Sequence, residues 1–132
     1  MKQDVQAERI RGQERWRRFN HLRSTLDFQR VRQAGRHLSG RYMSLMVAKS
    51  ASPEGPARIG FSVSKRVGSA VVRNRVKRRL RESSRRVLLS LPVGWDLVLT
   101  AKAPAAEASY ATLDTELRAL FVRAGMLDAE SK

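Results

Sequence analysis

Apolar and polar residues alternate in three stretches of the chain, which is the pattern of a strand with one face turned toward a core. These stretches are residues 41–49, 57–64 and 95–101. Residues 36–40 are typical of a turn or a short edge strand. The segment 50–56, which contains Pro53 and Gly55, is expected to be a loop between antiparallel strands. The pattern therefore predicts a small mixed sheet of about four strands.

Three other stretches show a helical period and carry signals for helix ends. The first runs from Ser24 or Thr25 to about Ala34 and stops at Gly35. The second and third are bounded by Ser69 and Pro92, and by Ser109 and Gly125. With the strands, these helices give the order αβββαβα. This order indicates an α+β fold, a two-layer α-β sandwich.

The second helix combines an apolar stripe with a high density of basic residues. Helical spacing brings onto one face Val72, Val76, Leu80, Ser83 and Val87. The opposite side collects Asn74, Lys77, Arg78, Arg81 and Arg85. Arg73 borders one edge of the stripe, and Arg75, Arg79 and Arg86 border the other. One face is thus suited to a core, whereas the rest is suited to an anionic partner.

The charge on this helix is not balanced within it. Eight of the fourteen residues from Arg73 to Arg86 are basic, and Glu82 is the only acid among them. Like-charged pairs at i,i+3 and i,i+4 spacing cost about 1–3 kcal/mol in total at low salt. In a marginally stable protein, this cost indicates that the charge serves binding. A solvated face kept basic for solubility is the alternative interpretation.

The chain as a whole is basic, with a formal net charge of +15 over 132 residues. Residues 1–94 contribute +17, and residues 95–132 contribute −2. Arginine outnumbers lysine 21 to 6, and its planar guanidinium suits phosphate recognition. This distribution predicts binding to nucleic acid. An anionic membrane surface is a second candidate, but the helix presents small valines where a membrane-binding helix would carry bulky apolar residues.

Other features of the sequence exclude several classes of protein. The chain has no cysteine, which excludes disulfides and thiolate metal sites and fits a cytoplasmic location. No apolar run reaches the roughly 18–20 residues of a membrane span, so no membrane partner is expected. Residues 1–20 lack the apolar core of a secretory signal and are expected to form a flexible basic extension. One domain is expected at residues 21–127, followed by a tail at 128–132.

The sequence offers little for catalysis or metal binding within this chain. His21 and His37 are its only histidines, and its carboxylates do not cluster with them at ligand spacing. We therefore expect no metal site and no catalytic side chain. A nuclease that uses His21 and His37 as acid and base is one alternative function. A ribosomal-type protein that binds many RNAs is another.

One segment resembles a known family. Residues 61–68, Phe-Ser-Val-Ser-Lys-Arg-Val-Gly, are followed at 70–82 by Ala-Val-Val-Arg-Asn-Arg-Val-Lys-Arg-Arg-Leu-Arg-Glu. Together they closely resemble the signature of the protein component of bacterial ribonuclease P. The similarity continues on both sides, in residues 26–31, Gly35, residues 95–105 and residues 109–110. It covers roughly residues 20–126.

The resemblance implies both a fold and an activity. The fold would contain a left-handed β-α-β crossover that carries the basic helix. The chain would be the protein subunit of a ribonucleoprotein that removes the 5′ leader from precursor tRNA by endonucleolytic cleavage. The catalytic centre would lie in the RNA subunit, which would also hold most of the Mg²⁺. The partners would be that catalytic RNA and the 5′ leader of precursor tRNA, with no obligate protein partner.

The resemblance also implies two sets of site residues. The set expected to contact the catalytic RNA comprises Lys65, Arg66, Arg73, Asn74, Arg75, Lys77, Arg78 and Arg81. The set expected to line a cleft for the single-stranded leader comprises Phe28, Arg32 and Met46. Phe28 matches an aromatic residue of that cleft, whereas Arg32 and Met46 stand where many relatives carry aromatic residues. Leader contact is therefore expected to depend more on charge and less on base stacking than is usual in the family.

Overall fold

The structure, a computed structural model, describes residue 22 and residues 24–128. The predicted N-terminal extension at 1–20, the candidate histidine His21 and residues 129–132 of the predicted tail lie outside the described residues. None of the helices that the structure describes combines the length and the apolar character of a membrane span.

Four strands form one mixed sheet in the described part of the chain. They are β1 (Arg36–Ser39), β2 (Met43–Lys49), β3 (Arg58–Val63) and β4 (Trp95–Ala101). Their spatial order is β1-β2-β4-β3, and all neighbours pair antiparallel except β3 and β4, which are parallel. Of the two structures expected at residues 36–40, a turn or a short edge strand, the structure shows the edge strand. β2 and β3 run in opposite directions, as expected, but β4 lies between them.

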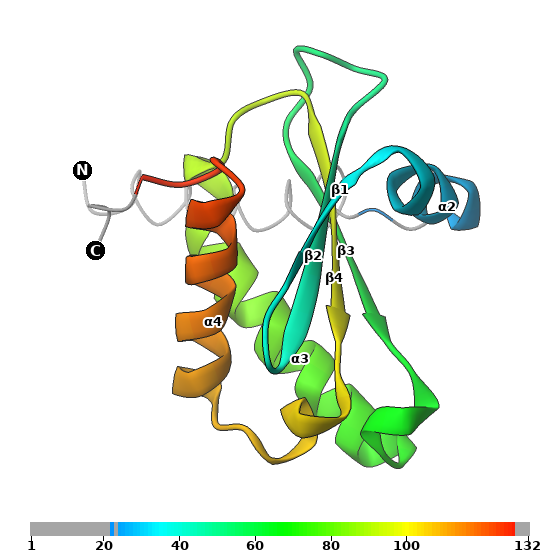
Figure 1. Cartoon of the computed structure of the whole chain (residues 1–132), viewed down its shortest axis with the longest axis vertical. Helices are drawn as coiled ribbons and strands as arrows, with labels where there is room; N and C mark the ends of the chain where they lie inside the picture. Colours follow the sequence, from blue (N-terminus) through cyan, green and yellow to red (C-terminus); the bar gives the residue numbers. More distant parts are fainter. Residues whose placement is uncertain (1–21, 23, 129–132) are drawn as a thin grey trace, which may run out of the picture.

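Three α-helices accompany the sheet in the described residues. They are α2 (Thr25–Ala34), α3 (Ala70–Val87) and α4 (Tyr110–Arg123). Short 3-10 turns form η1 (Lys65–Val67), η2 (Leu88–Ser90) and η3 (Ala103–Glu107). Helices α3 and α4 cover one face of the sheet, and α2 lies against the other (Figure 1). The predicted α+β class, with a mixed four-stranded sheet and three helices, is confirmed.

Helix α3 lies in the connection between β3 and β4, which are parallel neighbours. A parallel pair cannot be joined by a tight turn, because the chain must return to the end from which the first strand started. The basic helix is therefore an integral part of the sheet topology. The left-handed sense of this crossover stays a prediction.

Two helix starts use the capping side chains that the sequence predicts. The hydroxyl of Ser69 accepts a hydrogen bond from the backbone N–H of Val72 at 3.3 Å, and that of Ser109 accepts one from Thr112 at 3.1 Å. Helix α2 differs. Ser24 occupies its N-cap position, but the Ser24 side chain makes no capping hydrogen bond.

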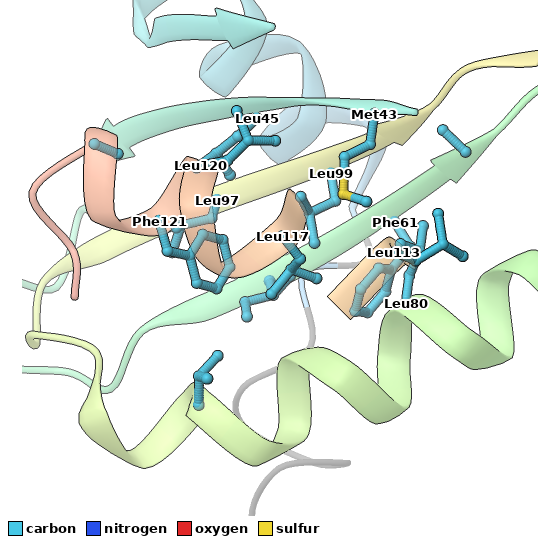
Figure 2. Close-up of a cluster of buried hydrophobic side chains, with 14 of the residues drawn as sticks. Met43, Leu45, Phe61, Leu80, Leu97, Leu99, Leu113, Leu117, Leu120 and Phe121 are labelled. Atoms are coloured by element: carbon cyan, nitrogen blue, oxygen red, sulfur yellow. The ribbon is translucent and has the colours of Figure 1, made fainter. Parts of the chain in front are cut away.

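The main core lies between the sheet and the helices α3 and α4 (Figure 2). The strands contribute one alternating set, as predicted: Met43, Leu45, Val47, Ile59, Phe61, Leu97 and Leu99. The two helices contribute chiefly Val76, Leu80, Leu113, Leu117, Leu120 and Phe121. On the opposite face of the sheet, Met46, Ala48 and Val98 pack with Leu22 and with Val31 of α2. The sheet is thus covered on both faces where α2 crosses it.

Candidate nucleic-acid interface

Helix α3 buries the apolar stripe that its sequence predicts. Val76, Leu80, Ser83 and Val87 are buried, and Val72 packs against the core from its edge. On the opposite side Asn74 and Arg78 are exposed to solvent. The stripe attaches α3 to the sheet and to α4, so the basic side chains are held on a rigid element with a fixed orientation.

The basic residues on one edge of α3 are bound within the protein. Nη2 of Arg75 donates to the carbonyl oxygen of Ala106 at 3.0 Å, and Nη1 of Arg79 donates to that of Ala108 at 2.7 Å. Arg86 donates to the hydroxyl of Tyr110 at 3.5 Å, and this hydrogen bond raises the pKa of Arg86 above its ordinary value. Arg75 and Arg79 thus tie α3 to the segment that precedes α4, and Arg86 ties it to the first residue of α4.

Of the remaining basic residues of α3, Arg85 pairs with Glu82, whose Oε1 lies 2.6 Å from Nη2 of Arg85, and four others have no such partner among the described residues. Within the described part of the chain, the side chains of Arg73, Lys77, Arg78 and Arg81 make no hydrogen bond. The Nε atoms of Arg73 and Arg81 are even shielded from solvent without a partner. Each such group gains from an anionic acceptor. This side of α3 is therefore the part of the helix that is best prepared to bind phosphate.

Two further basic residues extend this surface toward the start of α3. Lys65 and Arg66 are exposed on η1, in the short connection between β3 and α3. No acidic residue occupies the first turn of α3, where the helix dipole is positive. We call Lys65, Arg66, Arg73, Asn74, Lys77, Arg78 and Arg81 the basic surface. The resemblance also implies that Arg75 contacts the RNA. Arg75 borders the basic surface, but its Nη2 donates to the carbonyl oxygen of Ala106.

The two kinds of arginine on α3 should respond differently to substitution. We expect Arg79→Ala to lower the free energy of unfolding by about 1–2 kcal/mol, because the hydrogen bond to the Ala108 carbonyl is lost. Arg78→Ala removes the same charge from an exposed position, so it should leave stability nearly unchanged and weaken RNA binding instead. Urea unfolding and RNA titration of both variants check this. Equal losses of stability in the two variants would contradict the separation of the arginines of α3 into those bound within the protein and those available to RNA.

A second candidate surface lies between α2 and the sheet. The ring of Phe28 lies directly over Gly60 of β3, because a Cβ atom at Gly60 would come within 2.5 Å of Phe28 Cζ. The guanidinium carbon of Arg32 is 5.9 Å from the centre of the Phe28 ring, and its Nη2 donates to the hydroxyl of Ser62 at 3.3 Å. Met46 is only 5% exposed and lies in the apolar cluster beneath α2. Phe28 and Arg32 are thus the accessible members of the predicted cleft.

Next to Phe28 and Arg32, hydroxyl side chains line up across all four strands. The residues in register, which we call the hydroxyl row, are Ser39, Ser44, Thr100 and Ser62. Arg32 binds Ser62, and Nζ of Lys102 binds Ser39 at 2.5 Å. The Thr100 hydroxyl is buried and has no hydrogen-bond partner in the described residues. The sequence shows these residues only as separate polar positions, since their alignment depends on the strand order.

The close contact between Gly60 and Phe28 leads to a prediction for stability. We expect Gly60→Ala to cost about 1–3 kcal/mol of unfolding free energy, because the added methyl group displaces the Phe28 ring. Phe28→Leu in the same chain should recover part of this cost by giving the methyl group room. A double-mutant cycle measured by urea unfolding tests the contact. Strict additivity of the two substitutions would show that the ring does not lie over Gly60.

The structure places His37 apart from any catalytic grouping in the described residues. Its ring Nε2 lies 3.1 Å from the backbone carbonyl of Arg32, at the end of α2. His21, the other member of the alternative acid–base pair, is outside the described residues. The described residues also contain no group of three or more His, Cys, Asp or Glu side chains that could hold a metal ion.

Comparisons with known proteins agree with this geometry. The sequence matches the family model described as Ribonuclease P over residues 16–125. A relative from Chloroflexus aggregans, named Ribonuclease P protein component, is 39% identical over 112 residues, which cover 84% of this chain and 82% of that protein. A relative of the same name from Clostridium acetobutylicum is 36% identical over 113 residues, which cover 86% of this chain and 95% of that protein.

Solved structures show the same fold. The RNase P protein from Staphylococcus aureus aligns with a TM-score of 0.74 and 25% identity over 83% of this chain and 98% of that one. The RNase P protein from Thermotoga maritima aligns with a TM-score of 0.69 and 27% identity over 78% and 96% of the two chains. The family model and the relatives each span most of the sequence, and the basic surface lies within the residues that the family model matches. The chain belongs to the family of ribonuclease P protein components.

Proposed function

We propose that this chain is the RNA-binding subunit of a ribonuclease P ribonucleoprotein, in which it assists the catalytic RNA in removing the 5′ leader from precursor tRNA in the cytoplasm. The observation that carries this proposal is the basic surface on α3, whose cationic side chains have no partner among the described residues. Family membership supports the RNA of ribonuclease P as the partner of this surface.

Contact with the catalytic RNA is assigned to the basic surface. Its cations come from one face of a single rigid helix and from the turn before it, which suits a folded RNA with a fixed arrangement of phosphates. Asn74 is exposed among these cations, and its amide suits bidentate pairing with the edge of an adenine. The surface thus provides mainly contacts to the phosphate backbone.

Contact with the single-stranded leader is assigned to Phe28, Arg32 and the hydroxyl row. A half-buried aromatic ring offers a stacking surface for one base, and Arg32 beside it offers charge to the adjoining phosphate. Ser44 and Ser62, which are partly exposed, offer hydroxyl groups on the floor of the same surface, beside the buried hydroxyl of Thr100. Met46 supports this floor from within the apolar cluster.

The chemistry of cleavage is assigned to the RNA subunit. The described residues offer no group of carboxylates and histidines suited to a metal ion, so Mg²⁺ is expected to be held by RNA phosphates. The role of this chain is then to neutralise phosphate charge and to orient the leader. Both effects increase in importance when Mg²⁺ is scarce, because the RNA then has fewer counterions of its own.

Cleavage of precursor tRNA by the RNA subunit at low Mg²⁺, with and without this chain, tests the proposal. We expect faster cleavage and tighter binding of precursor tRNA when the chain is present. No effect on either quantity would overturn the proposal. Equal affinity for many unrelated RNAs would favour a general RNA-packing protein. Cleavage by the chain without the RNA subunit, abolished by His37→Ala or His21→Ala, would favour a nuclease.

A further inference from the structure

Four charged side chains form a compact cluster between α2 and the sheet. They are Asp27 and Arg30 of α2, Arg58 of β3 and Asp96 of β4. Two acids and two bases give the cluster no net charge, so it is not a further phosphate-binding surface. The cluster lies four residues along β3 and β4 from the hydroxyl row, roughly 13 Å away.

Asp96 is the centre of this cluster. Its side chain is fully buried, and its carboxylate accepts two hydrogen bonds from Arg58, at 2.9 Å from Nε and 2.8 Å from Nη2. This hydrogen bonding raises the pKa of Arg58 above its ordinary value. Nη2 of Arg30, on α2, donates a hydrogen bond to the same carboxylate. Asp96 therefore joins β3, β4 and α2 through one side chain.

Arg30 connects the cluster to α2 and to a third strand. Its Nη1 donates to the carbonyl oxygen of Lys49 at the end of β2, at 2.9 Å, while Asp27 lies 3.5 Å from its Nη2. The guanidinium of Arg30 is therefore held by three groups at once. A planar guanidinium fixed by several acceptors determines the orientation of the helix that carries it more closely than an apolar contact does.

The apolar attachment of α2 to the sheet is small by comparison. Val31 is the only buried residue of this helix, and Leu26 is 76% exposed. Phe28 is half-buried and Arg32 is exposed. The position of both side chains over β3 therefore depends on what else holds α2 in place, and Arg30 with Asp96 is the strongest such link.

We propose that Asp96 is a positioning residue for leader binding: through Arg30 it fixes α2 so that Phe28 and Arg32 stand beside the hydroxyl row. This inference rests on the proposed function, because it concerns the surface assigned to the leader. Asp96 itself is fully buried and negatively charged, so it does not contact RNA. Its removal changes leader binding only through the position of α2.

The position of α2 can be measured without RNA. In the full-length chain, the ring of Phe28 over Gly60 shifts the Gly60 proton resonances through its ring current. We expect Asp96→Asn to abolish this shift, because the amide keeps the size of the carboxylate but leaves Arg30 and Arg58 without the charge between them. Arg30→Met, which removes only the link from α2, should have the same effect while the Arg58–Asp96 pair stays intact.

The effect on leader binding is measured with the holoenzyme, as the ratio of the affinities for precursor and mature tRNA. We expect this ratio to fall at least about fivefold in both variants, the low end of what the loss of one base–aromatic stacking contact causes. The slope of log affinity for precursor tRNA against log salt should fall by no more than about 0.7, because only the one phosphate contact assigned to Arg32 is lost. Val87→Ala, which destabilises the opposite face of the sheet, serves as the control and should keep the wild-type ratio.

The outcomes separate this inference from the proposed function. Unchanged Gly60 resonances in both variants would overturn the positioning role, whatever the RNA measurements give. Lost ring-current shifts with an unchanged affinity ratio would also overturn it, because the position of α2 would then not matter for the leader. A wild-type holoenzyme without preference for precursor tRNA would overturn the leader assignment, while the spectra alone would still show that Asp96 fixes α2.

Discussion

Replacing Leu80 with alanine is expected to lower the free energy of unfolding by about 2–5 kcal/mol. Leu80 is fully buried at the middle of α3 and belongs to the same core cluster as Phe61 of β3 and Leu113 of α4 (Figure 2). The substitution removes apolar surface from this contact and leaves a cavity among three elements. Such a loss is large for a domain of this size, whose total stability is about 5–15 kcal/mol.

Urea unfolding measures this effect as a lower midpoint with an unchanged dependence on denaturant. Val71→Ala, in the first turn of the same helix, is a suitable control, because Val71 is 76% exposed and should lose little. A loss below about 1 kcal/mol for Leu80→Ala would mean that α3 is not attached to the sheet through this stripe. At temperatures at which the Leu80→Ala variant is folded, it should bind RNA as the wild-type chain does.

The second large effect concerns RNA affinity. Replacing Arg73, Lys77 and Arg81 together with glutamine removes three cations of the basic surface that have no partner in the described residues. The slope of log affinity against log salt should fall by about 2–3, given roughly 0.7–0.9 per phosphate contact. A fourfold rise in salt concentration should therefore weaken the variant about 20- to 40-fold less than the wild-type chain.

Stability should not fall with this change, because the substitutions remove three like-charged i,i+4 pairs, Arg73 with Lys77, Lys77 with Arg81, and Arg81 with Arg85. A matched control replaces Arg41, Lys49 and Arg123 with glutamine, which lowers the net charge equally at positions away from α3. The control should keep the wild-type salt slope. Equal effects of the two triple variants would show that RNA responds to the overall charge of the protein and not to the basic surface.

Features that depend on neighbours in the sequence were predicted well. The spacing of Val72, Val76 and Leu80 identified the buried stripe of α3, and the capping roles of Ser69 and Ser109 are confirmed. Strand alternation identified the core-facing residues, because a strand with one buried face must place apolar residues at every second position. These signals are local, so a single sequence contains them in full.

Features that depend on distant segments were not predicted. The place of β4 between β2 and β3 follows from strand pairing over long separations, which periodicity does not record. The acceptors of Arg75 and Arg79 are backbone carbonyls 31 and 29 residues away, so the sequence placed both arginines at the edge of the apolar stripe without indicating these hydrogen bonds. Asp96 appeared as one polar position in a strand, and only the fold brings Arg30 and Arg58 to it.

The covering of the second face by α2 was not predicted from the apolar pattern, although the resemblance implied a cleft lined by residues of this helix and by Met46. Helix α2 has one buried residue, so its pattern of apolar positions gave little indication of where it would lie. Once α2 is placed, Met46 belongs to the apolar cluster beneath it, while Phe28 and Arg32 stay accessible. The start of α2 was also predicted only in part. Ser24 occupies the N-cap position, but its hydroxyl does not make the capping hydrogen bond that this position allows.

Helix α3 connects the parallel strands β3 and β4 along the chain, and this connection couples the binding of anions at α3 to the pairing of the two strands. The basic helix can hold its orientation only when its stripe is seated on the paired strands, and its like charges oppose helix formation until anions neutralise them. Binding of a polyanion at α3 is therefore thermodynamically linked to the pairing of β3 with β4. An RNA present at a hundred times its dissociation constant would add about 2.7 kcal/mol to the stability of the whole sheet. The RNA then acts as a folding ligand for this protein as well as its binding partner.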